Sequence, residues 1–107
     1  MTTFSVHDLE ARLKARAQAS AEASYTRKLL DRGIAHCAKK LGEEAVEVAI
    51  DAVKGNRDAV IAESADLLYH LVVVWAEMGI TPADVWSEME RREKAYGIAE
   101  KVPKQAA

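Results

Sequence analysis

Five carboxylate residues gather in the middle of the sequence, at spacings that would place them on two facing helices. They are Glu43, Glu44, Glu47, Glu63 and Asp66. A helix advances about 100° and about 1.5 Å per residue, so acids three positions apart share one helix face. Carboxylates this close repel and raise one another's pKa, and a divalent cation relieves that repulsion. The pattern therefore suggests a site for Mg²⁺, with Mn²⁺ as a substitute.

An alternative interpretation is that the acids of the first helix simply face water. One row has the spacing of a solvated polar stripe with a single ion pair, namely Lys40, Glu44, Glu47 and Asp51. Asp66 argues against this, because it precedes a strongly apolar stretch where an unpaired carboxylate is costly to bury. His70, four residues later, could instead supply a buried hydrogen-bonding partner for Asp66 without any metal.

The apolar periodicity predicts an all-α protein of four to five helices. The expected helices are residues 6–19, 34–53 and 58–78, and one that begins at Pro82 with Thr81 as N-cap. Residues 24–30 are expected to form a short helical turn or an ordered loop. A tight hairpin at residues 54–57 would bring the two acidic segments side by side, which allows one shared site.

The helix expected over residues 58–78 is apolar on every side from Ala65 to Ala76. A helix of this kind must be buried all round, and a chain with so few helices cannot do that alone. We therefore expect a bundle completed by homodimerisation. Residues 1–97 are predicted to form one domain, and residues 98–107 a flexible tail.

Charge is unevenly distributed, although the formal net charge is only -2. Lys and Arg outnumber acids by eight to four over residues 1–40, whereas acids outnumber Lys and Arg by seven to two over residues 41–66. The acidic centre would repel duplex nucleic acid, but a basic segment beside it suits a small anion held between cations and bound metal. We predict a small-molecule substrate and no nucleic-acid partner.

The remaining composition indicates a soluble protein of a reducing compartment. Cys37 is the single cysteine, so an internal disulfide is excluded. The sequence shows neither an apolar signal segment at its N-terminus nor a run of about 18 uninterrupted apolar residues. We expect a cytoplasmic protein with no membrane partner.

The acid motif resembles a known signature. Glu43-Glu44-x-x-Glu47, followed after fifteen residues by Glu63-x-x-Asp66, is similar to the metal-binding pattern of the all-α nucleoside triphosphate pyrophosphohydrolases, which include MazG and the dimeric dUTPases. Three further segments resemble the phosphoribosyl-ATP pyrophosphohydrolase family: Ser24-Tyr25-Thr26, Lys39-Lys40-x-Gly42-Glu43-Glu44, and Ala65-Asp66-Leu67-Leu68-Tyr69-His70-Leu71. The resemblance spans most of the chain.

This resemblance implies a MazG-like bundle that hydrolyses phosphoribosyl-ATP to phosphoribosyl-AMP and pyrophosphate with Mg²⁺, the second step of histidine biosynthesis. The metal ligands that it implies are Glu44, Glu47, Glu63 and Asp66. Glu43 would lie beside them, as a further ligand or as the group that orients or deprotonates the attacking water.

Substrate-binding candidates come from basic and hydroxyl residues near the acids. The candidate phosphate ligands are Arg27, Lys28, Arg32, Lys39 and Lys40. Ser24, Tyr25 and Thr26 would bind ribose or phosphate through their hydroxyls, or cap a helix. Two other functions stay open. One is a MazG-like pyrophosphatase acting on a noncanonical triphosphate or dUTP, and the other is a non-catalytic helical dimerisation module with solvated acids.

Overall fold

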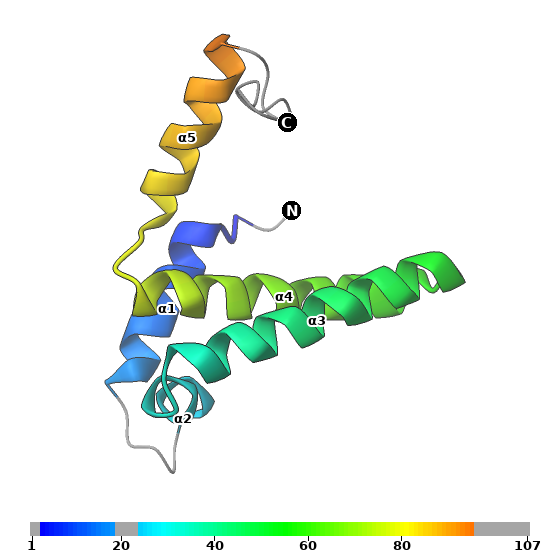
Figure 1. Cartoon of the computed structure of the whole chain (residues 1–107), viewed down its shortest axis with the longest axis horizontal. Helices are drawn as coiled ribbons and strands as arrows, with labels where there is room; N and C mark the ends of the chain where they lie inside the picture. The colour runs from blue at the N-terminus through cyan, green and yellow to red at the C-terminus, as the bar shows by residue number, and fades with distance from the viewer. Residues whose placement is uncertain (1–2, 19–23, 96–107) are drawn as a thin grey trace, which may run out of the picture.

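Five helices form the part of the chain that the computed structural model describes, residues 3–18 and 24–95 (Figure 1). They are α1 Val6–Ala17, α2 Tyr25–Asp31, α3 Ile34–Lys54, α4 Arg57–Glu77 and α5 Pro82–Ala95. No strand occurs in these two ranges, so the all-α prediction is confirmed. The predicted tail and the domain limit at residue 97 lie outside the described residues.

Helices α3 and α4 form a long antiparallel hairpin, which runs across the middle of Figure 1. The turn forms because Gly55 takes a left-handed conformation with φ of 72° and ends α3. The Asn56 side chain then accepts a hydrogen bond from the Ala59 amide at 3.2 Å, which starts α4. Asp58 is an acid in the first turn of α4. This hairpin sets the acids of both helices opposite one another.

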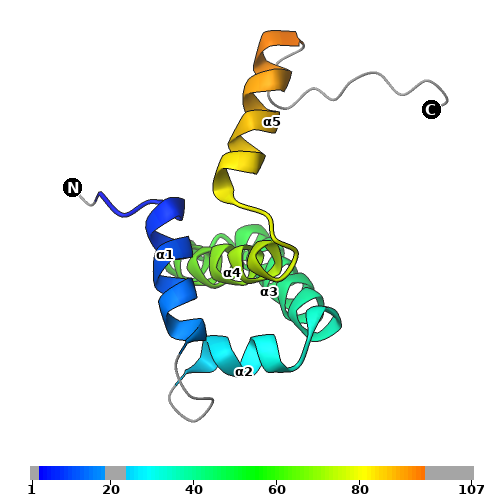
Figure 2. The same cartoon turned by 90° about the vertical axis from the view of Figure 1, so that its left-hand side faces the viewer.

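The buried core lies at the end of the hairpin where α1 and α2 pack (Figure 2). It consists of Leu13, Leu29, Cys37, Val72 and Val73. A capping box between Ser5 and Asp8 starts α1. The helix ends at Ala17 rather than continuing to residue 19, because Gln18 caps it; residue 19 itself lies outside the described residues. The segment expected as a helical turn or a loop is the helix α2, with Ser24 as its N-cap.

Helix α5 points away from the hairpin in both views (Figures 1 and 2). Thr81 and Asp84 cap its start reciprocally, as the sequence predicts. Its contact with α1 includes a hydrogen bond of 3.1 Å from the Trp86 indole to the His7 ring. An arm attached by so few contacts leaves most of the hairpin surface uncovered.

The hairpin carries a row of exposed apolar side chains, called here the apolar face. Its members are Val46, Ile50, Val53, Ile61 and Leu68. Among the described helices, α4 is also long and apolar enough to cross a membrane by length and composition, a test that core helices of soluble proteins pass as well. The expected burial of α4 on all sides is therefore not achieved within one chain.

Candidate metal centre

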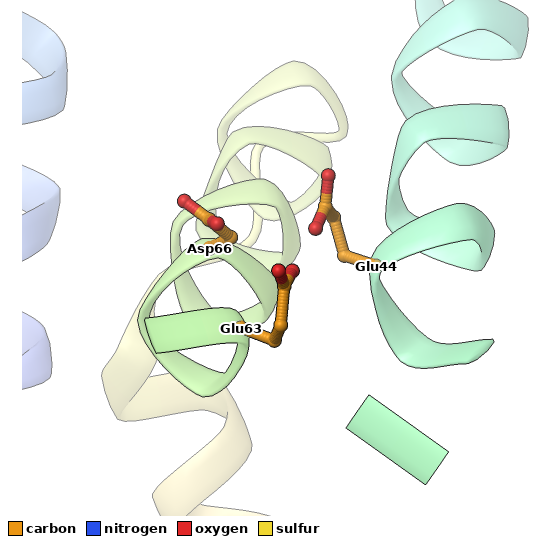
Figure 3. Close-up of side chains that lie close together, drawn as sticks. All are labelled: Glu44, Glu63 and Asp66. Carbon is orange, nitrogen blue, oxygen red and sulfur yellow. The ribbon is translucent and has the colours of Figure 1, made fainter. Parts of the chain in front are cut away.

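Three of the five acids converge between α3 and α4. Figure 3 shows Glu44 from α3 close to Glu63 and Asp66 from α4, with the carboxylates of Glu44 and Glu63 turned toward one another. One oxygen from each lies within 4.8 Å of the other two. We call these three residues the acid cluster. The sequence predicts that these acids lie close together, because the helical periodicity and the tight hairpin at residues 54–57 place them on facing sides of α3 and α4.

The acid cluster is electrostatically unfavourable as it stands. Oε2 of Glu44 and Oε2 of Glu63 are shielded from solvent and have no hydrogen-bond partner. The neighbouring Glu47 carboxylate, then burial, then the Glu44 carboxylate raise the pKa of Glu63 from 4.5 to about 7. Buried polar atoms are normally paired, so two unpaired carboxylate oxygens side by side indicate a missing positive partner.

The donor set fits a hard divalent cation. Mg²⁺ takes oxygen ligands at 2.0–2.1 Å, so the oxygens around one ion lie about 3–4 Å apart. Carboxylate oxygens already within 4.8 Å of one another reach that spacing with small side-chain rotations. A cation there would also satisfy the two unpaired oxygens. The residues present therefore fit Mg²⁺ in chemistry and in position, and Mn²⁺ accepts the same ligand types.

Glu47 and Glu43 border the acid cluster without belonging to it. Glu47 is exposed and is close enough to Glu63 to be the largest cause of its raised pKa. Glu43 faces the other way and forms an ion pair of 3.2 Å with Lys40. The ion pair of the predicted polar stripe would have joined Lys40 to Glu44, so that detail is wrong. Because Glu43 takes up the Lys40 charge, Glu44 stays available to the cluster.

Two expectations about Asp66 are corrected. Asp66 is exposed in the single chain rather than buried at the head of the apolar stretch. His70 does not pair with its carboxylate: Nδ1 of His70 donates to the main-chain carbonyl of Asp66 at 2.7 Å. The helix backbone thus satisfies the imidazole, and the Asp66 carboxylate is left free to join the acid cluster.

A second polar group lies one turn further along α4. The Thr26 and Tyr69 hydroxyls share a short hydrogen bond, and the Tyr25 hydroxyl donates to Nε2 of His70 at 3.2 Å. The rings of Tyr25 and Tyr69 stack, with centroids 6.1 Å apart. We call these four residues the hydroxyl network. Sequence reasoning missed Tyr69, although its place three residues after Asp66 puts it on the same helix face.

The cations predicted as phosphate ligands differ in their contacts and exposure. Arg27 is engaged structurally, because it pairs with Asp31 at 3.0 Å and donates to the Ala17 carbonyl. Lys39 approaches Glu43 at 4.0 Å. Lys28 and Arg32 are exposed on or beside α2. Within the described residues, none of the five candidate cations, Lys40 included, lies in the acid cluster. A basic side chain therefore does not relieve the repulsion among its carboxylates.

Comparison with known proteins identifies the family. A family model described as phosphoribosyl-ATP pyrophosphohydrolase matches residues 6–93. The chain belongs to this family. The match includes every acid and every substrate-binding candidate named above. The resemblance to phosphoribosyl-ATP pyrophosphohydrolases that the motifs indicated is confirmed.

Relatives in the phosphoribosyl-ATP pyrophosphohydrolase family are similar over most of the chain. "Phosphoribosyl-ATP pyrophosphatase 2" of Rhodopseudomonas palustris is 64% identical over 81 residues, which cover 76% of this chain and 62% of that protein. The phosphoribosyl-ATP pyrophosphatase of Azospirillum brasilense is 55% identical over 87% of this chain and 84% of its own length. That of Methylobacterium nodulans is 54% identical over 94% of both. The chain thus spans less than two thirds of the first of these relatives and nearly all of the last.

Proposed function

We propose that this protein hydrolyses phosphoribosyl-ATP to phosphoribosyl-AMP and pyrophosphate with Mg²⁺, as the second step of histidine biosynthesis in the cytoplasm. The observation that carries the proposal is the acid cluster, with two shielded carboxylate oxygens lacking partners. Membership of the phosphoribosyl-ATP pyrophosphohydrolase family supports the choice of substrate. The names of the relatives support the same choice.

In this proposal Glu44, Glu47, Glu63 and Asp66 hold the metal. Bound there, Mg²⁺ would neutralise the charge of phosphate oxygens and activate a water molecule as nucleophile. Mg²⁺ seldom takes a cage made only of protein ligands, so substrate phosphates and water would complete its coordination. The raised pKa of Glu63 means that this carboxylate must lose a proton before it becomes a full ligand near neutral pH.

Glu43 is proposed as the residue that orients or deprotonates the attacking water. Its position next to Glu44 on α3 supports this role, because it places Glu43 at the border of the acid cluster. Its carboxylate forms an ion pair with Lys40 of the same helix at the edge of the site. An ionised carboxylate is the form that can accept a proton from water.

The substrate would lie between the acid cluster and the residues of α2 and early α3. Ser24, Tyr25 and Thr26 would contact ribose or phosphate, and the cations would hold phosphates. These cations are Arg27, Lys28, Arg32, Lys39 and Lys40. Lys39 and Lys40 are best supported, because they share α3 with the acids and lie about one turn before them.

The proposal includes a homodimer with the apolar face at its interface. Leu68 and Ile61 are about half exposed in the single chain, and Val53 almost fully. Exposed apolar side chains on two neighbouring helices support an interaction site, and a second copy of the chain would supply the same surface. Sedimentation equilibrium would give twice the chain mass, whereas a monomer at all concentrations would refute this part.

The activity is tested by incubating the pure protein with Mg²⁺ and a panel of substrates, with pyrophosphate release as the readout. We expect the fastest release from phosphoribosyl-ATP, and slow or no release from ATP, dUTP and noncanonical triphosphates. Faster release from dUTP would favour the second candidate, another MazG-like pyrophosphatase. No release from any of them, with a stable dimer, would favour the non-catalytic dimerisation module.

A further inference from the structure

We propose that a pocket beside the hydroxyl network receives the phosphate of the substrate's phosphoribosyl group, and that Arg16 is its specificity-determining residue. This inference rests on the proposed function, because it assigns the second end of the same substrate. It concerns a residue on α1 that no motif in the sequence singles out.

The pocket lies where α1, α2 and α4 meet. Its volume is about 310 Å³, and its lining residues are Arg16, Ser24, Tyr25, Thr26 and Tyr69. At about 30 Å³ per water molecule, it holds roughly ten waters, which is ample for a phosphate and part of a ribose. Four of the five lining residues carry a hydroxyl and the fifth is a cation. That is a lining suited to a phosphorylated sugar.

The hydroxyl wall of the pocket is fixed by contacts within the protein. Thr26 is 3% exposed and its hydroxyl is bonded to that of Tyr69. The Ser24 hydroxyl accepts from the Arg27 amide at 3.2 Å as it caps α2, so its own proton is free to be donated. A wall whose groups are already held loses little freedom when it binds a ligand, which favours selective recognition.

Arg16 is the one cation among the residues that line this pocket. Among residues 3–18 and 24–95 no carboxylate pairs with its guanidinium, whereas Lys14 on the same helix pairs with Glu10 at 3.7 Å. Arg16 and Tyr69 line the same pocket. An unpaired guanidinium at the rim of a hydroxyl-lined pocket is suited to bidentate binding of a phosphate.

The pocket lies on the same face of α4 as the acid cluster. Tyr69 follows Asp66 by three residues, so the pocket begins roughly 5 Å along α4 from the acid cluster, on the same helix face. Phosphoribosyl-ATP carries a triphosphate at one end and a sugar phosphate at the other. The acid cluster can accept phosphate only through a metal, whereas the Arg16 pocket can accept it directly. The two sites together would select a nucleotide with phosphate at both ends over ordinary triphosphates.

The test compares Arg16→Gln with Arg12→Gln as a matched control. Arg12 lies one turn earlier on α1, stands over the Phe4 ring at 4.9 Å and does not line the pocket. We expect Arg16→Gln to raise KM for phosphoribosyl-ATP, and Ki for ribose 5-phosphate as an inhibitor, by at least about tenfold, the low end for a charge-assisted hydrogen bond. kcat and Ki for ATP should change by less than about twofold, because the triphosphate site is untouched. Arg16→Lys should recover part of the loss, and Arg12→Gln should behave as wild type.

Two results would overturn the inference. One is a KM for phosphoribosyl-ATP in Arg16→Gln within about twofold of wild type. The other is an equal rise in Ki for ATP, which would place Arg16 at the triphosphate. If the wild type releases no pyrophosphate from phosphoribosyl-ATP, the proposed function fails. Calorimetry of ribose 5-phosphate binding to wild type and Arg16→Gln then decides the role of Arg16 independently, with lost binding supporting it and equal binding refuting it.

Discussion

The acid cluster and the hydroxyl network lie one helical turn apart on α4, yet they differ in whether their polar groups have hydrogen-bond partners. In the hydroxyl network each side chain has a partner: Thr26 bonds Tyr69, and His70 bonds both Tyr25 and the Asp66 carbonyl. In the acid cluster two shielded carboxylate oxygens have none. Polar burial with partners stabilises a fold, whereas polar burial without partners costs stability and is tolerated where a ligand supplies the partner.

Whether a buried polar group has a hydrogen-bond partner distinguishes structural from chemical roles better than residue type does. Sequence reasoning placed Ser24, Tyr25 and Thr26 among the substrate ligands, but their observed contacts first of all join α2 to α4 and cap α2. The three acids of the cluster bring like charges together between α3 and α4, so they contribute charge rather than cohesion.

The largest expected effect comes from removing one carboxylate of the acid cluster. Glu44→Gln should lower the rate of pyrophosphate release from phosphoribosyl-ATP by at least about 100-fold, because a metal ligand is lost. The metal-free variant should be as stable as wild type or more so, since repulsion with Glu63 is relieved. Kinetics and thermal melting of one preparation measure both. Unchanged turnover, or a large loss of stability, would mean that Glu44 serves the fold.

The hydroxyl network should respond in the opposite way. Thr26→Val keeps the shape of the side chain but leaves the Tyr69 hydroxyl without a partner, and we expect it to cost about 1–3 kcal/mol of unfolding free energy. Urea denaturation measures this, with the exposed Thr3→Val as the control. If Thr26→Val proves as stable as the control, the hydroxyl network does not hold α2 to α4.

The smallest effect is a pH dependence caused by Glu63. Its pKa is about 7 in the folded protein and 4.5 when unfolded, so between these values the folded state binds more protons. Unfolding free energy of the metal-free protein should therefore fall as pH rises through this window. Melting temperatures of wild type and Glu63→Gln across the window isolate the effect, because the other titrating groups are common to both. Parallel curves would show that the Glu63 pKa is ordinary.

The hairpin was predictable from sequence because local rules determine it. Helical periodicity, the glycine at residue 55 and the acids at i and i+3 fix which side chains meet across α3 and α4. The Asp66 error arose because exposure depends on what covers α4, and one chain does not cover it. Arg16 could not be found from sequence, since its place beside Tyr69 depends on how α1 packs across α4, and no spacing rule specifies that packing.

The central claim, that the acid cluster is completed by a divalent cation, is tested most directly by melting the protein with and without Mg²⁺ at pH 8, above the pKa of Glu63. If Mg²⁺ is present at about ten times its Kd, it should stabilise the wild type by about 1.4 kcal/mol and raise its Tm by roughly 4 °C or more. Glu63→Gln should show little of this rise. A wild-type Tm unchanged by Mg²⁺ and by Mn²⁺ would contradict the claim and leave the acids as a solvated face.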